Sequence, residues 1–257
     1  MSVSASTAAD PSYRHRRVSE LLPIAVLVSG TGTNLQALLD TVHGREAEVV
    51  AVAASVAGAP ALARAERLDV PTAVFARSAY ADRHVRDAAL ADWLAARGAR
   101  LVVLAGYMEL LDGAFLSRFP GAVINVHPSL LPAFPGLAAI EQALAYGVKV
   151  FGVTVHFVDA GVDTGAVILQ RAVELPDARE PAQVLAALRP LEHELLPRAV
   201  ALFARGALAA DPENPRRTIV DPAVAEAVAE TVAEAGADPG PAAGVARADE
   251  ANRAGEG

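Results

Sequence analysis

The feature that most constrains the fold is an alternation of short apolar runs with longer segments of helical periodicity. Each apolar run is bounded by turn residues, as strands buried on both faces are; the runs occupy residues 24–28, 48–55, 72–75, 101–105 and 122–126. Amphipathic segments separate them, at residues 35–42, 61–68, 79–97 and 113–118. The alternation predicts an α/β fold with a Rossmann-like, mostly parallel sheet, right-handed crossovers and helices on both faces.

The later part of the chain is less regular. We expect a helix over residues 140–146, strands over 150–158 and 166–173, and a long helix over 181–205 that Pro190 and Pro197 break or kink. Composition then divides the chain into three parts: a disordered leader at 1–22, one domain at 23–208, and a linker with a largely disordered acidic tail at 209–257. Within that tail, the valine spacing over 223–235 allows a marginal helix.

Charge and composition exclude several classes of partner. The chain has 22 basic and 30 acidic residues and a net charge of -8, which argues against nucleic acid and anionic membranes as partners. No apolar run reaches the roughly 18 residues needed to span a bilayer, and the first 22 residues lack the apolar core of a secretory signal. The absence of cysteine excludes disulfides and thiolate chemistry. We expect a soluble cytoplasmic protein, either a monomer or a homodimer.

Two polar residues mark the end of the fifth apolar run. Asn125 and His127 are two positions apart, so on a strand their side chains project from the same face. Pro128 ends the strand there, at the carboxyl edge where open α/β sheets bind ligands. Asp163, in a loop 36 residues after His127, is the nearest plausible carboxylate. These three residues predict a polar site.

Their chemistry suits an oxyanion. An imidazole paired with a carboxylate stays protonated near neutral pH and donates to a developing negative charge, and Asn125 supplies a second donor. Three alternatives remain: a purely structural histidine, Ser129 as a nucleophile, and a zinc site formed by His127, His156 and Asp163. Ser129 lies in a proline-bounded turn without a nucleophile elbow, and no metal-ligand spacing supports zinc.

Two further segments suit ligands. The glycine-rich turn at 29–34, between a strand and a helix, offers backbone N–H groups to a single phosphate; it lacks the P-loop lysine and the third glycine of a dinucleotide site. Its alternative is an ordinary turn in which Thr33 or Asn34 caps the helix. The mostly apolar segment 104–111, with Met108, would wall a flat aromatic ligand or simply pack in the core.

Taken together, these and other segments resemble the phosphoribosylglycinamide formyltransferases, the folate-dependent enzymes of purine synthesis, over about residues 24–208. The resemblance is carried by Ser-Gly-Thr-Gly-Thr-Asn-Leu-Gln-Ala-Leu (29–38), Val-Leu-Ala-Gly-Tyr-Met (103–108), Asn-Val-His-Pro-Ser-Leu-Leu-Pro (125–132), Pro-Gly-Leu (135–137), Thr-Val-His-Phe-Val (154–158) and Val-Asp-Thr-Gly (162–165). The element around His127 with its downstream aspartate belongs to the wider formyltransferase group, and the glycine-rich loop narrows the resemblance to this branch.

The resemblance implies a role for particular residues. Asn125, His127 and Asp163 match the catalytic residues, and no metal is required. The substrate, 5'-phosphoribosylglycinamide, would be bound by Gly32, Thr33, Asn34 and Glu192. The co-substrate, 10-formyltetrahydrofolate, would be bound by Arg83, Met108, Glu109, Leu110, Leu111, Val158 and Asp159. Glu109 departs from the family, which usually has a basic residue there.

The implied reaction is transfer of the formyl group to the amine of the ribonucleotide. A formyltetrahydrofolate deformylase would share the same core but usually carries an amino-terminal regulatory domain, for which the 22 leading residues leave no room. A methionyl-tRNA formyltransferase would need a basic carboxy-terminal domain. A folate- or nucleotide-binding protein without turnover is the alternative motivated by Glu109 and by residues 137–140, a segment that commonly carries histidine in the family.

Overall fold

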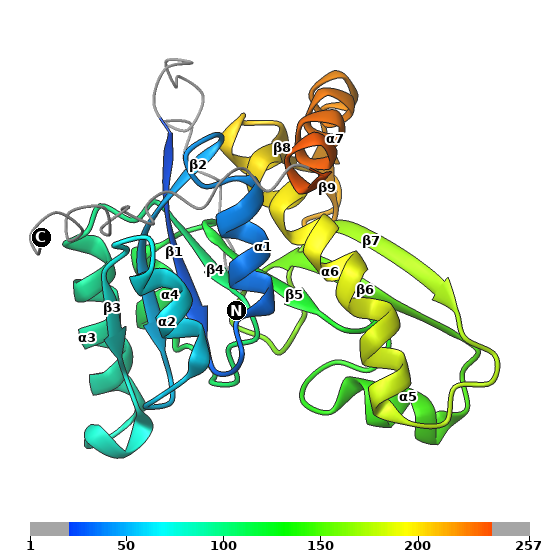
Figure 1. The fold of residues 1–257 in the computed structure, drawn as a ribbon, viewed down its shortest axis with the longest axis horizontal. Helices are drawn as coiled ribbons and strands as arrows, with labels where there is room; N and C mark the ends of the chain where they lie inside the picture. The colour runs from blue at the N-terminus through cyan, green and yellow to red at the C-terminus, as the bar shows by residue number, and fades with distance from the viewer. Residues whose placement is uncertain (1–20, 238–257) are drawn as a thin grey trace, which may run out of the picture.

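A mixed seven-stranded sheet organises the chain, and the computed structural model describes residues 21–237. The strand order is β3-β2-β1-β4-β5-β6-β7 (Figure 1). The strands are β1 (Leu22–Val28), β2 (Ala47–Ala54), β3 (Thr72–Val74), β4 (Leu101–Leu104), β5 (Val123–His127), β6 (Val150–Phe157) and β7 (Val167–Glu174). The first five are parallel, whereas β6 and β7 are antiparallel to their neighbours. The predicted mostly parallel α/β sheet is therefore confirmed.

Helices connect the strands and cover both faces of the sheet. They are α1 (Thr33–Thr41), α2 (Pro60–Glu66), α3 (Arg83–Ala95), α4 (Gly113–Arg118), α5 (Ala139–Tyr146) and α6 (Pro181–Ala204), with a short 3-10 helix η2 (Arg77–Ala79). On one face α1 contacts both α2 and α6, and on the other α3 contacts α4, as right-handed crossovers on either side of β1 require. Because the strand order reverses between β1 and β4, the loops after these strands meet at the edge where ligands bind.

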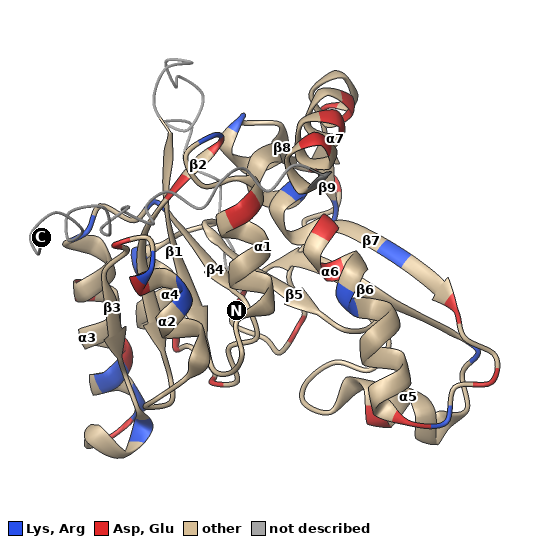
Figure 2. Ribbon diagram, in the orientation of Figure 1, with Lys and Arg blue, Asp and Glu red and all other residues tan. Residues whose placement is uncertain are grey.

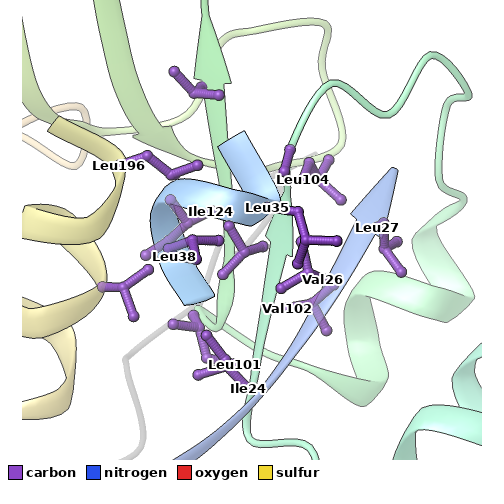
Figure 3. Close-up of a cluster of buried hydrophobic side chains, with 14 of the residues drawn as sticks. Ile24, Val26, Leu27, Leu35, Leu38, Leu101, Val102, Leu104, Ile124 and Leu196 are labelled. Carbon is purple, nitrogen blue, oxygen red and sulfur yellow. The ribbon is translucent and has the colours of Figure 1, made fainter. Parts of the chain in front are cut away.

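The core lies between α1, α6 and the central strands. Its side chains are fully buried and come from β1, β4, β5 and the two helices (Figure 3), among them Ile24, Val102, Ile124, Leu35, Leu38 and Leu196. These positions follow the i, i+3 spacing on α1 and the continuous apolar runs of the strands, which is why the sequence predicted both. This packing holds the carboxyl ends of β1, β4 and β5 side by side.

Two helices differ from the expectation. Instead of one helix over 79–97, the chain forms η2 and then α3, which begins after Asp82; the Asp82 carboxylate accepts a 2.9 Å hydrogen bond from the Val85 N–H and so caps the helix. In α6, Pro190 and Pro197 lie inside a single helix of 24 residues, so of the two predicted outcomes, a break or a kink, the break does not occur. A proline costs roughly 3 kcal/mol in a helix interior, and the buried apolar face of α6 offsets that cost.

The segment expected to be a linker after residue 208 is ordered. It forms an antiparallel hairpin of β8 (Leu208–Ala210) and β9 (Thr218–Val220), followed by α7 (Pro222–Ala237), which packs against α6 and α1. Val228 and Val232 of α7 are buried, and acidic residues lie along the same helix (Figure 2). This helix agrees with the one that the valine spacing allows over residues 223–235, and the described fold continues to residue 237.

The start of the folded domain differs slightly from the expected boundary. Leu22 is already part of β1 and is buried, so the leader expected at 1–22 ends before that residue. Residues 1–20 and 238–257, on which the rest of the predicted disorder falls, lie outside the described residues. Within residues 21–237, no helix combines the length and apolarity needed to cross a membrane.

Candidate active site

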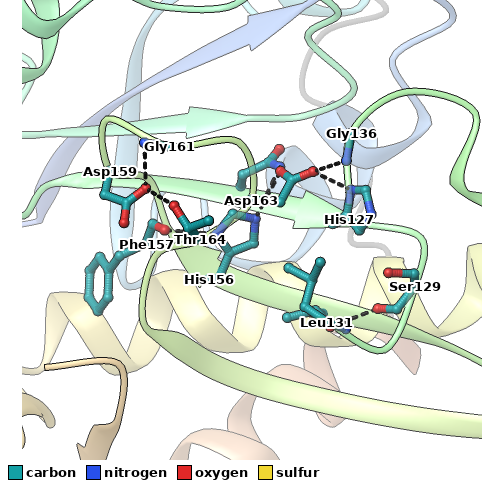
Figure 4. A network of polar contacts seen from close by, with 12 residues as sticks. His127, Ser129, Leu131, Gly136, His156, Phe157, Asp159, Gly161, Asp163 and Thr164 are labelled. Atoms are coloured by element: carbon teal, nitrogen blue, oxygen red, sulfur yellow. Dashed lines mark hydrogen bonds and ion pairs between the residues drawn. The ribbon is translucent and has the colours of Figure 1, made fainter. Parts of the chain in front are cut away.

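Asp163 lies at the centre of a polar cluster at the carboxyl end of β5. Its Oδ2 lies 3.3 Å from Nδ1 of His127, the last residue of β5, and its Oδ1 accepts a 3.5 Å hydrogen bond from Nδ2 of Asn125 (Figure 4). The two side chains that strand periodicity placed on one face therefore reach the same carboxylate. This confirms the predicted convergence of Asn125, His127 and Asp163.

His156 of β6 is a fourth member, and we call these four residues the Asp163 cluster. Its Nε2 lies 3.5 Å from Asp163 Oδ1 and 3.3 Å from Asn125 Nδ2, while its Nδ1 lies 2.7 Å from the Phe157 carbonyl oxygen and so carries a proton. Sequence patterns suggest His156 only as a possible zinc ligand. The missing information was the antiparallel register that pairs Asn125 with His156.

The surrounding backbone orients the cluster. The Gly136 N–H donates a 2.7 Å hydrogen bond to Asp163 Oδ2, and Nε2 of His127 lies 2.9 Å from the Phe134 carbonyl oxygen. Phe134, Ala138 and Asp163 have positive φ angles of 53°, 56° and 52°, a conformation that non-glycine residues seldom adopt outside functional sites and tight turns. Strained backbone therefore aims one donor and one acceptor at the cluster.

The contacts determine the charges in the cluster. Burial acts to raise the pKa of Asp163, but hydrogen bonds from His156 and Gly136 and the charge of His127 lower it more, so its pKa lies below the ordinary value. Asp163 is therefore ionised at neutral pH. Both partners of the His127 ring are acceptors, so only the doubly protonated imidazolium satisfies both contacts.

The two rival chemistries do not fit this arrangement. Ser129 is buried, and its hydroxyl donates a 2.6 Å hydrogen bond to the Ala133 carbonyl oxygen instead of facing a base. Among the described residues, no group of three His, Cys, Asp or Glu side chains is arranged to hold a metal ion. The carboxylate, the amide and the imidazoles of the cluster are of the types that stabilise charge and move protons.

The glycine-rich turn leads directly into α1. Its N-cap is Gly32, with φ +73°, and no side chain caps the helix, so the alternative in which Thr33 or Asn34 is the cap is wrong. A Cβ at Gly32 would lie 2.5 Å from the Ala61 Cβ, so α2 packs closely against this turn. The first N–H groups of α1 therefore have no side-chain partner, which is the arrangement that binds a phosphate.

Asn34 and Glu192 come together across the fold. The Asn34 Nδ2 donates a 2.9 Å hydrogen bond to Glu192 Oε2, although the two residues are 158 positions apart, and both are buried. Burial raises the pKa of Glu192, and Asn34 and Arg189 offset part of the shift. The Asn34 Oδ1 is buried and has no hydrogen-bond partner. The structure thus places Glu192 beside the turn, and its contact with a substrate stays a prediction.

The segment from Met108 to Asp112, called the 108–112 segment below, follows β4 and faces outward. Met108 and Leu110 are 63% and 57% exposed, so simple core packing does not explain them, whereas Leu111 packs against the core. The Met108 N–H donates a 2.9 Å hydrogen bond to the hydroxyl of Ser29, which ties the segment to the glycine-rich turn. An apolar surface therefore stands between that turn and the Asp163 cluster.

The remaining predicted residues lie in two places. The Val158 N–H bonds to the Val123 carbonyl oxygen, and Asp159 turns the following loop by accepting hydrogen bonds from the Gly161 N–H and the Thr164 hydroxyl (Figure 4). Arg83 is exposed in the first turn of α3, away from these contacts. Its role toward a co-substrate is an expectation from the resemblance.

Comparison with known proteins agrees with this geometry. A family model described as "Formyl transferase" matches residues 22–200. The phosphoribosylglycinamide formyltransferase of Haemophilus influenzae is 39% identical over 187 residues, covering 72% of this chain and 88% of the relative. The solved glycinamide ribonucleotide transformylase 1 of Symbiobacterium toebii has a TM-score of 0.73 and 45% identity, covering 78% of this chain and 94% of that one.

Other relatives are much longer. The trifunctional purine biosynthetic protein adenosine-3 of Drosophila melanogaster is 44% identical over 207 residues, which cover 79% of this chain but only 15% of the fly protein. The fold and the site define a member of the formyl transferase family. Within that family, the chain belongs with the phosphoribosylglycinamide formyltransferases.

Proposed function

We propose that the chain transfers the formyl group of 10-formyltetrahydrofolate to the amine of 5'-phosphoribosylglycinamide, a step of de novo purine biosynthesis. The observation that carries the proposal is the contact of one carboxylate, Asp163, with both His127 and Asn125. This cluster lies at the same sheet edge as an uncapped helix N-terminus suited to phosphate and an exposed apolar segment suited to a pterin ring. Both substrates therefore have complementary surfaces beside the reacting groups.

The reaction begins when the free-base amine attacks the formyl carbon. A C–N bond forms and the formyl oxygen becomes an oxyanion, which the positive charge of the His127 imidazolium and an N–H of the Asn125 amide stabilise. The 3.5 Å contact of Asn125 with Asp163 is at the limit of a hydrogen bond, so this amide reorients toward the oxyanion at little cost. The bond from the formyl carbon to N10 then breaks, and no atom is oxidised or reduced.

Asp163 handles the proton. The attacking amine loses one proton and N10 gains one, and the ionised carboxylate relays it, with water as the intermediary. The ion pair with His127 and the contact with His156 keep Asp163 charged when the amine arrives. Alignment of the two substrates contributes as much as this proton transfer, because it makes the attack effectively unimolecular.

The test is to supply 10-formyltetrahydrofolate labelled in the formyl group, with and without the ribonucleotide. Labelled formylglycinamide ribonucleotide is the expected product, formed only when both substrates are present. Label released as formate without the ribonucleotide would instead identify a hydrolase. Binding of the folate with neither product would identify a binding protein without turnover.

The proposal also covers the conditions of the reaction. We expect the protein to act in the cytoplasm, as a monomer or homodimer. We also expect no nucleic acid or membrane partner, and the net charge of -8 supports this second expectation. We expect no metal requirement. Formyl transfer that survives exhaustive dialysis against a chelator would agree with this expectation, and activity restored only by an added metal ion would refute it.

A further inference from the structure

Arg86 is a fully buried arginine on α3, behind the 108–112 segment. Its Nε donates a 2.8 Å hydrogen bond to Asp87 Oδ1, its Nη1 a 2.8 Å bond to Glu109 Oε2, and its Nη2 a 3.0 Å bond to the Leu110 carbonyl oxygen. A buried charge is tolerated only when it is paired and hydrogen-bonded, so this guanidinium needs these partners. Two of the three belong to the 108–112 segment.

The neighbouring residues hold the other end of the segment. Asp87 is also fully buried, and its Oδ2 accepts a 2.8 Å hydrogen bond from the Asp112 N–H. The Asp112 carboxylate caps α4 through the Phe115 N–H and lies 2.6 Å from Nδ1 of His84. The first turns of α3 thus contact the segment at positions 109, 110 and 112, while its outward side chains remain exposed.

The ion pair also changes what Glu109 presents to a ligand. Burial acts to lower the pKa of Arg86, but the hydrogen bonds that it donates to Glu109 and Asp87 raise it more, so the guanidinium stays charged. The Glu109 side chain is 29% exposed and borders an open cavity of about 560 Å³, which is lined also by Ser55, Val56, Ala57, Ala76, Arg77 and Ser78. With Arg86 in place, the carboxylate is held at the back of this space; without it, the carboxylate is free to turn into the cavity.

We propose that Arg86 is a positioning residue for the formyl donor: it holds the 108–112 segment in its binding conformation through Glu109 and the Leu110 carbonyl. Glu109 is then an internal anchor, and its paired charge repels an acidic ligand less than a free carboxylate does. The proposal rests on the proposed function, because it assigns the exposed faces of Met108 and Leu110 to the folate.

The direct test compares Glu109→Ala and Arg86→Lys with the wild type in formyl-transfer kinetics. Asp92→Ala is the matched control, since it also removes an ion pair between α3 and α4, formed with Arg118 on the surface. Loss of a hydrogen bond to a charged group weakens binding by roughly tenfold. We expect the KM for the formyl donor to rise by about that factor in Glu109→Ala and by more in Arg86→Lys. The KM for the ribonucleotide and kcat should stay within about threefold of wild type, and Asp92→Ala should be unchanged.

A merely structural role would give a different pattern. It would lower kcat through the folded fraction, or raise both KM values together, and either outcome would overturn the proposal. Lysine cannot reproduce the planar fork of arginine, so Arg86→Lys is the stronger perturbation. Glu109→Ala leaves the Arg86–Asp87 pair intact and carries the test if Arg86→Lys does not fold.

Hydrogen exchange of the protein without substrates separates this proposal from the proposed function. In Glu109→Ala, the amides of residues 108–112 should exchange faster than in the wild type, while those of α1 keep their protection. Unchanged exchange in the segment would refute the positioning role even if formyl transfer is confirmed. Faster exchange in a chain that transfers no formyl group would support the contact of Arg86 with the 108–112 segment and refute the proposed reaction.

Discussion

The two sides of the candidate active site are built in different ways. In the Asp163 cluster the histidines are buried and the polar groups contact one another at the ends of neighbouring strands. The 108–112 segment instead exposes Met108 and Leu110 and is held from behind by charges on α3. Under the proposed function, the cluster fixes the groups that contact the transition state, and the segment presents a surface that binds the ring of the formyl donor.

This difference predicts different kinetic consequences. An interaction made mainly in the transition state affects kcat, whereas one made equally in the bound complex affects KM. Changes in the Asp163 cluster should therefore lower kcat, and changes in the 108–112 segment should raise the KM of the formyl donor. Substitutions on the two sides of the site test that division.

The largest effect is expected from Asp163→Asn. Asparagine tolerates the left-handed backbone at φ 52°, so the loop should keep its shape while the carboxylate that contacts His127 and His156 loses its charge. Removing a proton-transfer group typically costs about 10²–10⁴ in rate, and we expect kcat to fall within that range while both KM values change little. Steady-state kinetics checks this, and a rise in KM at unchanged kcat would break the division.

A smaller effect is expected from Leu110→Ser. This residue is 57% exposed and would become covered only when a ring packs on it. Because burying a leucine side chain contributes about 1.5–3 kcal/mol at most, partial coverage predicts a rise of roughly three- to tenfold in the KM of the formyl donor. Ile219→Ser on β9, exposed by 44%, is the control. A fall in kcat without a change in KM would contradict the assignment of the segment.

The smallest effect concerns stability, and it contrasts Asp163 with Glu192. The pKa of Glu192 is raised by burial, so its contribution to stability is full below the ordinary value of 4.5 and is lost as the pH rises through the raised value. As the pH rises above 4.5, we expect the free energy of unfolding of Glu192→Gln to increase relative to that of the wild type. Urea unfolding at several pH values measures this difference.

The pKa of Asp163 is lowered, so its contribution has the opposite dependence. It is present above the ordinary value of 3.8 and is lost as the pH falls through the lowered value. Asp163→Asn should therefore lose stability relative to wild type at neutral pH, and the difference should shrink in acid. The same sign of pH dependence in both variants would show that the two carboxylates do not differ in this way.

The sequence predicted the parts of the site that depend on local patterns. Strand periodicity placed Asn125 and His127 on one face, and the glycine spacing predicted the turn before α1, whose binding of an anion stays a prediction. His156 escaped because its membership depends on an antiparallel register between β5 and β6. Arg86 was not predicted because arginine is seldom fully buried, and an arginine near the start of a helix is expected to be exposed. In addition, its partners Glu109 and Leu110 lie 23 and 24 positions away in the sequence.

Long-range contacts explain the other gaps. Glu192 was placed beside Asn34 only by resemblance, since no local pattern connects α6 with the turn before α1. The valine spacing allowed a helix over residues 223–235, but only the fold shows that Val228 and Val232 are buried and that α7 packs against α6 and α1. Sequence patterns therefore predicted the helices and strands and the residues on each of their faces. Which faces contact one another was decided by tertiary packing.

The most direct test of the account is the rate of formyl transfer from 10-formyltetrahydrofolate to the ribonucleotide by wild type and His127→Ala. Because the charge of His127 is proposed to stabilise the oxyanion, kcat should fall by at least about a hundredfold, the usual effect of losing such a group. The wild type must form the formylated ribonucleotide, and the variant must keep its fold. Transfer within a few-fold of the wild-type rate would contradict the central role given to the Asp163 cluster.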